Sequence, residues 1–122
     1  MAGTLTLSSV NNNNAFGFSM YRYNITVDSS GNLSGNNISN IKPSLLLSAK
    51  IVPGTSFAGC NFSLKDSDGI DTLSGNGSSV ASTGGYIFPS GGVRVRDSLI
   101  PTISGAAASA QLVLEIVTTG EA

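Results

Sequence analysis

Three carboxylates stand close together near the middle of the chain, and their spacing is the one most suggestive of chemistry. Asp66, Asp68 and Asp71 fall within six residues of one another. Carboxylate oxygens are ligands that hard cations such as Ca²⁺ prefer. An EF-hand loop, however, needs an acid at its twelfth position, where this chain has Gly77. The spacing therefore favours a β-turn whose Asp side chains accept hydrogen bonds from nearby amides, and we expect no metal or cofactor.

Nucleophilic catalysis is a second chemistry to weigh, and the chain offers little for it. Serine and threonine are abundant, but there is no histidine to act as their base. Cys60 is the only cysteine, and it alternates with Phe62 and Leu64 in one run. Residues that alternate in this way share one face of a strand, so we expect a buried, unreactive thiol and no disulfide. The sequence predicts that the protein is not an enzyme.

Two arginines lie two residues apart, at Arg94 and Arg96, so they would project from one face of a strand. Their guanidinium groups could pair with carboxylates of a neighbouring subunit, and a plain solvated edge strand is the alternative. The formal net charge of the chain is -1, and no wider basic patch accompanies the pair. We therefore expect no nucleic-acid partner.

Seven of the eight aromatic residues divide into two groups by their surroundings. Tyr21, Tyr23 and Phe62 stand in alternating runs and fit the core face of strands. Four others lie beside Gly- and Asn-rich breaks in the pattern: Phe16, Phe18, Tyr86 and Phe88. Some of these four could be exposed anchors at an interface, with core packing as the alternative for each one.

The overall composition points to protein contacts rather than to titratable chemistry. Charged residues make up 11% of the 122 residues, whereas soluble domains average about a quarter. Hydrophobic residues still make up 40%, enough for one core in a single domain spanning residues 1–122. No secretory signal is expected, and no apolar run approaches the roughly 20 residues that cross a bilayer, so no membrane partner is expected either.

The dominant period of the hydrophobic pattern is two, which is typical of strands with one buried face. Turn residues separate about eight such segments, and helical signals are poor. The predicted strands cover residues 3–9, 17–28, 33–41, 44–52, 60–66, 86–95 (broken), 99–104 and 110–117. Short strands with Gly, Pro and Asn turns favour an all-β fold, an antiparallel β-sandwich or a jelly-roll-like barrel.

Three segments between the predicted strands have low complexity. Residues 11–14 are four asparagines, which indicate a polar loop, and residues 1–16 could form an N-terminal arm or an edge strand. Residues 73–85 indicate a Ser/Gly/Asn loop with little to bury. Both loops could be solvated or could become ordered against a partner. Residues 105–110 are too short for a stable helix and favour a loop or a single turn.

Several of these turns and strands follow an order that resembles small virion proteins of tailed bacteriophages. The similar stretches are a strand at residues 21–26, a Gly-Asn turn at 30–36, a Pro-Gly corner at 51–54, the Asp-rich turn within 62–75, and an Ala/Gly loop with a strand at 103–117. The resemblance covers roughly residues 17–117. It implies a β-sandwich component of the phage particle and carries over no catalytic motif.

The function that this resemblance implies is structural. The expected role is an auxiliary capsid decoration or cement protein, located in the virion, which binds the major capsid protein and itself, as a homotrimer. A neck or tail accessory protein is the alternative. A carbohydrate-binding β-sandwich module is a further alternative, which the absence of tryptophan disfavours.

Overall fold

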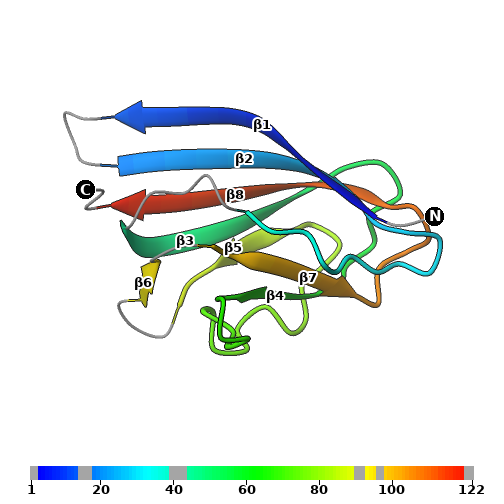
Figure 1. Cartoon of the computed structure of the whole chain (residues 1–122). Helices are drawn as coiled ribbons and strands as arrows, with labels where there is room; N and C mark the ends of the chain where they lie inside the picture. Colours follow the sequence, from blue (N-terminus) through cyan, green and yellow to red (C-terminus); the bar gives the residue numbers. More distant parts are fainter. Residues whose placement is uncertain (1–2, 14–17, 39–43, 90–92, 96–97, 120–122) are drawn as a thin grey trace.

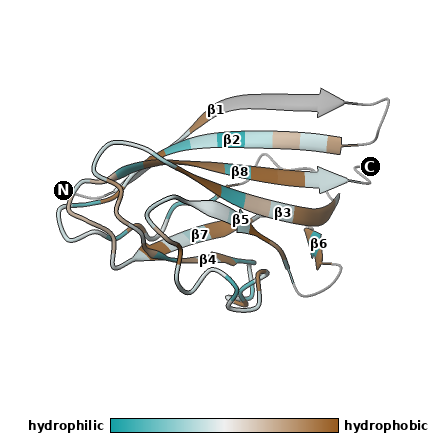
Figure 2. Ribbon diagram, turned by 180° about the vertical axis from the view of Figure 1, so that it is seen from behind, coloured by the Kyte–Doolittle hydropathy of each residue, from teal (hydrophilic) through white to brown (hydrophobic). Residues whose placement is uncertain are grey.

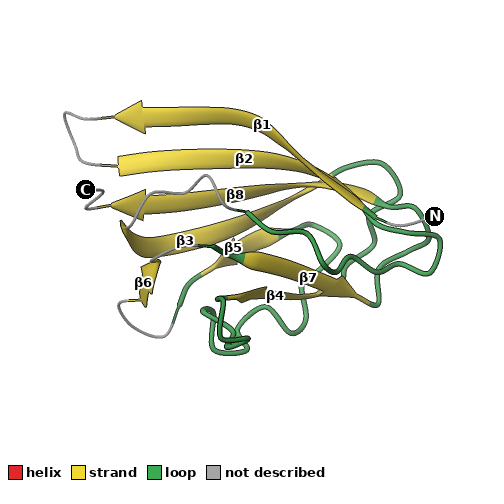
Figure 3. Ribbon diagram, in the orientation of Figure 1, coloured by secondary structure: helices red, strands yellow, loops and turns green. Residues whose placement is uncertain are grey.

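A computed structural model describes residues 3–13, 18–38, 44–89, 93–95 and 98–119. Every described residue lies in a strand, an isolated bridge, a turn or a loop (Figure 3). The strands are β1 (Thr4–Asn13), β2 (Phe18–Thr26), β3 (Ser44–Pro53), β4 (Asn61–Lys65), β5 (Gly85–Ile87), β6 (Val93–Val95), β7 (Ile100–Ser104) and β8 (Gln111–Thr119). The prediction of an all-β fold with about eight strands is confirmed.

The strands form two sheets, and the larger one sets the shape of the molecule. Its order is β1-β2-β8-β3-β5, and β6 also pairs with β3 beyond the end of β5 (Figure 1). All of these pairs are antiparallel. The last strand of the sequence therefore lies between β2 and β3, and it connects the two halves of the sheet.

A smaller layer, built on the antiparallel pair β4 and β7, packs against one face of the large sheet. Isolated bridges widen this layer on both sides. Leu33 and Ile38 bridge to Ile103 and Leu99 beside β7, while Val80 bridges to Cys60 beside β4. The two layers together make a sandwich-like arrangement.

The core lies between the two layers and follows the period-two pattern of the strands. The buried residues of β2 and β8 alternate with half-buried or exposed ones, apart from the buried Glu115. Hydrophobic segments interrupted by polar ones run along β2, β8 and β3 (Figure 2). The core face of these three strands carries Tyr21, Tyr23, Ile25, Leu112, Leu114, Ile116, Ala49 and Ile51. The core positions predicted for Tyr21, Tyr23 and Phe62 are confirmed.

The strand predicted over residues 33–41 is wrong within its described part, residues 33–38. Leu33 and Ile38 each exchange two backbone hydrogen bonds, with Ile103 and Leu99 respectively, but no ladder joins the two bridges. Gly35 between them has a φ of 76°, a left-handed conformation that interrupts an extended strand. The segment therefore touches β7 at two points instead of pairing along its length.

Two of the predicted loops also differ from the structure. Residues 11–13 belong to β1 and pair with Met20, Ser19 and Phe18, the first three residues of β2. Residues 73–79 form a series of hydrogen-bonded turns, and the Leu73 side chain is fully buried. The prediction that residues 73–85 have little to bury is therefore wrong at Leu73. Residues 105–110 form bends and turns, as expected.

Candidate functional site

Four strands of the large sheet place a row of polar and aromatic residues on its outer face, away from the smaller layer. The register pairs Arg22 with Glu115, Glu115 with Lys50, and Lys50 with Tyr86. We call this row, extended by Phe88, the outer row. It crosses the sheet from β2 to β5, so its members come from four distant parts of the sequence.

A carboxylate at the centre of the outer row lies beneath its neighbours. Glu115 is only 6% exposed, although it is on the outer face. The Arg22 guanidinium donates a hydrogen bond from Nη1 to Glu115 Oε2 and forms an ion pair with it. Lys50, on the other side of Glu115, is directly opposite it in the register of β3 and β8. The central charge of this face is therefore flanked by two cations of the same sheet.

The aromatic end of the outer row is exposed to solvent. Tyr86 and Phe88 are 63% and 60% exposed, on either side of the buried Ile87. Their rings are nearly parallel, with centroids 6.2 Å apart and planes 15° apart. The Lys50 ammonium lies 5.0 Å from the centroid of the Tyr86 ring, within the range of a cation–π contact. Of the two alternatives that the sequence left for these aromatics, exposed anchor or core packing, the structure gives both residues the exposed position.

A side-chain hydrogen bond fixes the end of this aromatic pair. Asn76 Nδ2 donates to the backbone oxygen of Phe88 at 2.6 Å. Asn76 belongs to the series of turns that follows β4, so the smaller layer supports the position of Phe88. The backbone that carries the second of the two aromatic rings is therefore held in place by this hydrogen bond.

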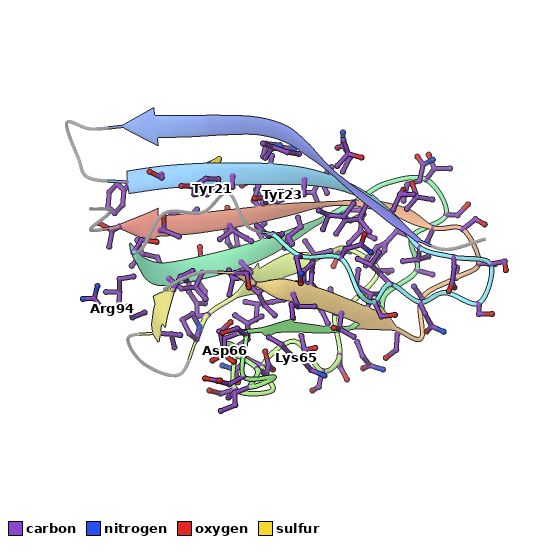
Figure 4. The ribbon with its side chains drawn as sticks, viewed as in Figure 1. Tyr21, Tyr23, Lys65, Asp66 and Arg94 are labelled. Carbon is purple, nitrogen blue, oxygen red and sulfur yellow. The ribbon has the colours of Figure 1, made fainter. Side chains whose placement is uncertain are left out.

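The other interface candidates are spread over the molecule. Phe18, at the start of β2, is 45% exposed. Arg94 is exposed on β6, opposite Leu45 of β3, and its side chain extends away from the sheets (Figure 4). Phe16 and Arg96 lie outside the described residues. The structure thus brings Tyr86 and Phe88 together but does not join Phe18 or Arg94 to them.

The carboxylates of the Asp-rich turn bind backbone amides. Asp66 Oδ1 accepts hydrogen bonds from the amides of Asp68 and Ile70, at 2.9 and 3.1 Å. Asp71 accepts three, from Leu64, Leu73 and Gly75. The expectation of Asp side chains that bond local amides is confirmed for Asp66 and Asp71. Within the part of the chain that is described, no group of three acids, cysteines or histidines is placed to hold a metal ion.

A shallow cup lies on the outer side of the smaller layer. Its volume is about 220 Å³, and more of its lining surface is apolar than polar, although most of the lining residues carry a hydroxyl, amide or carboxylate group. The lining residues include Asn61, Ser63, Asp71, Ser78, Thr102 and Ser104. Both oxygens of Asp71 are already hydrogen-bonded to backbone amides, so this carboxylate is committed to holding the turn.

The single thiol is buried, as its position in an alternating run predicts. Cys60 is 7% exposed and lies in the core beside the bridge to Val80. Burial raises the pKa of the Cys60 thiol from 9.0 to about 11, because the apolar surroundings disfavour the thiolate. The nucleophilic form is therefore scarce at neutral pH.

The sequence alone did not identify Arg22, Lys50 and Glu115 as members of a site. Each stands at a polar position of an alternating run, and this pattern does place it on the outer face. Only the register of β2, β8 and β3 shows that the three lie in one row. Register between strands far apart in sequence is not encoded in any local motif.

The fold and this face define an all-β, sandwich-like protein with an exposed aromatic pair at one end of a charge-paired row. In comparisons with protein-family models, curated proteins and solved structures, nothing matched the chain. Among the described residues there is no helix that is both long enough and apolar enough to span a membrane.

Proposed function

We propose that this chain is a structural virion protein, an auxiliary capsid decoration or cement protein that binds and stabilises a major capsid shell. The observation that carries the proposal is the outer row, a face with internally paired charges and two protruding aromatic rings. The order of turns and strands that resembles small phage virion proteins supports the same role.

The paired charges of the outer row suit a surface that packs against protein. Burying an unpaired charge in an interface is costly, because the charge loses its water without gaining a partner. Glu115 already has Arg22 as its partner, and Lys50 lies against the Tyr86 ring. A second protein could cover this face without leaving Glu115 unpaired.

The aromatic pair supplies an anchor of the kind that dominates protein interfaces. Tyrosine is enriched among the residues that contribute most to binding, and aromatic residues are enriched in interface cores. Tyr86 and Phe88 present two adjacent rings on a backbone held by Asn76. Self-association as a trimer would repeat this anchor three times and would strengthen a weak contact by avidity.

The most direct test is the composition of the particle itself. Mass spectrometry of purified particles of the virus that encodes this chain is expected to detect it at hundreds of copies per particle, the number that a shell requires. A copy number of about six to eighteen would indicate the neck or tail instead, because those structures follow a single symmetry axis. Absence from the particle would refute both roles.

The aromatic anchor can be tested by substitution. The double variant Tyr86→Ser/Phe88→Ser is expected to bind particles that lack the protein at least roughly tenfold more weakly, measured by cosedimentation, because interface aromatics often contribute about 2 kcal/mol or more. Its thermal unfolding should be close to that of the wild type, since both rings are exposed.

A matched control removes an equally exposed hydrophobic side chain from another place. Ile70 is 65% exposed on the Asp-rich turn, so Ile70→Ser should bind particles like the wild type. Equal losses in the two variants would contradict a role for the aromatic pair.

A carbohydrate-binding module is the second candidate, and the same pair of rings favours it. Two nearly parallel exposed rings can stack on the apolar face of sugar rings. A glycan array is the test: saturable binding that is lost in Tyr86→Ser would replace the virion proposal with this one.

A further inference from the structure

Three of the four sheet edges in the described structure are covered or guarded. The β3 edge of the large sheet carries only β5 and β6, three residues each, with the exposed Arg94 on β6. In the smaller layer, bridges from Leu33 and Ile38 cover the free side of β7. Val80 and Asp71 bridge to the free side of β4, at Cys60 and Lys65. Short strands, charges and covering segments are the usual means of preventing edge-to-edge pairing.

The remaining edge, β1, has little of this protection. It is ten residues long, and β2 is its only partner among the described residues (Figure 1). Its sequence, TLTLSSVNNN, contains no charged residue and no proline. The only irregularity in its pairing with β2 is a shift in register between Leu7 and Ser9. Alternate backbone groups of such a strand point away from the sheet and can pair with another strand.

Leu7 on β1 is exposed although it lies on the core face of the sheet. Leu7 pairs with Tyr23, so the register places it on the core face of the sheet. Tyr23 is almost fully buried, whereas Leu7 is 43% exposed. A strand placed next to β1 would cover Leu7 from the open side.

We propose that β1 of one copy pairs with β1 of a second copy, antiparallel, across a two-fold axis. The contact joins the two large sheets into one continuous sheet. An uncharged strand suits this occupant because, in any register, pairing with itself brings no like charges together. A ten-residue strand offers a long ladder, and an isologous contact of this kind closes at two copies.

This inference goes beyond the proposed virion role and does not depend on it. A trimer ring uses heterologous contacts, whereas the β1 contact is isologous and joins two copies. Capsid lattices contain both local three-fold and local two-fold axes, so the two contacts are compatible. Failure of the β1 contact would leave the particle-binding proposal untouched, since that proposal is tested on particles.

The first test measures the association of the purified chain. Sedimentation velocity over a wide concentration range is expected to show a monomer–dimer equilibrium. Hydrogen exchange on the same samples should show alternate amides of Thr4–Asn13 protected at high concentration and exchanging faster on dilution. A chain that stays monomeric, or that associates without protecting these amides, would overturn the proposal.

The second test adds charge to the edge. Thr4 and Thr6 are exposed on β1, so Thr4→Lys/Thr6→Lys should fold normally and weaken the dimer at least roughly tenfold, because lysines on an edge strand oppose its pairing with another strand. The control Asn24→Lys/Gln111→Lys adds the same charge at exposed positions of the inner strands β2 and β8 and should leave the dimer intact.

The comparison of these variants decides the site of contact. Thermal unfolding and slow exchange of β8 amides verify that each variant is folded. Dissociation of the edge variant alone supports pairing through β1. An edge variant that dimerises like the wild type, or a control that dissociates equally, would overturn it. A wild-type monomer that gains β1 protection only on a particle would overturn it too, and would indicate a strand of another protein as the occupant.

Discussion

At the scale of single residues, Glu115 is the buried charge on which the outer face of the large sheet depends. Its carboxylate accepts a hydrogen bond from Arg22, and the register places Lys50 on its other side. Local pattern predicts that Glu115 lies on a polar face, because it alternates with Leu114 and Ile116. Its burial could not be predicted, because it results from neighbours on strands that are distant in sequence.

Replacing this carboxylate with an amide is expected to destabilise the protein. In Glu115→Gln the Arg22 and Lys50 cations flank a neutral group, so the free energy of unfolding should fall by about 1–2 kcal/mol. The loss is no larger because the Arg22 side chain is 38% exposed, and solvent screens its charge. Urea unfolding measures the change.

A double-mutant cycle isolates the interaction between these two residues. Arg22→Gln alone should also destabilise the protein, and the double variant should lose less than the sum of the two single losses. Additive losses would contradict a direct contribution of the Arg22–Glu115 ion pair.

Burial of Cys60 makes the free energy of unfolding depend on pH under alkaline conditions. The folded-state pKa of about 11 lies above the unfolded value of 9.0, so the unfolded chain loses its proton first as the pH rises. The contribution of the thiol is therefore fully present below about pH 9 and is lost as the pH rises towards 11. The urea midpoint is expected to fall between about pH 9 and pH 11, and to fall less steeply in Cys60→Ala. Equal slopes in the two proteins would refute this assignment.

At the scale of elements, the turns after β4 are held by one carboxylate. Asp71 accepts amide hydrogen bonds from Leu64 in β4 and from Leu73 and Gly75 in the following turns. The sequence predicted that Asp side chains would bond local amides here. It did not predict that these turns bury Leu73, because Ser, Gly and Asn around that residue suggest a solvated loop.

The adjacent aspartates provide a matched pair for testing this role. Asp71→Ala removes the acceptor of three amides and is expected to cost about 2–3 kcal/mol of unfolding free energy. Asp68 is exposed and only donates its own amide to Asp66, so Asp68→Ala should stay within about 0.5 kcal/mol of the wild type. Chemical denaturation of both variants is the measurement, and equal losses would contradict the role of Asp71.

At the scale of the whole molecule, two turns from distant parts of the sequence meet at one end of the sandwich. The Ala106 amide, between β7 and β8, donates to the Gly31 oxygen, and the Ser109 amide donates to the Asp28 oxygen. Gly31 has a φ of 79°, and a Cβ there would lie 1.9 Å from the Ala106 oxygen. This close approach connects the β2 end of the large sheet to the chain that leaves the smaller layer.

A comparison of two glycines with the same backbone conformation distinguishes the cost of backbone strain from the cost of a steric clash. Gly35 has a φ of 76°, but a Cβ added to it would meet no atom within 4 Å, so Gly35→Ala should cost about 1 kcal/mol. Gly31→Ala adds a backbone clash and should cost roughly 3 kcal/mol or more, with a lower melting temperature. Similar losses in the two variants would show that the contact between the turns contributes little.

The sequence predicted the fold class and most strands because both rest on local patterns of period two and on turn residues. It did not predict the strand order, the row of Arg22, Glu115 and Lys50, or the loss of the strand over residues 33–38. Those features depend on contacts between distant segments and, at Gly35, on the conformation of a single residue. The exposed aromatics Tyr86 and Phe88 were predicted as candidates because they stand beside glycine-rich breaks.

The position of β8 between β2 and β3 has a consequence for synthesis. Until Gln111–Thr119 has left the ribosome, the facing edges of β2 and β3 have no partner, and the large sheet cannot close. Folding of this sheet therefore follows translation of the last strand instead of proceeding along the nascent chain. A chain truncated before β8 would expose the unpaired edges of β2 and β3 in addition to that of β1, and we expect such a chain to aggregate.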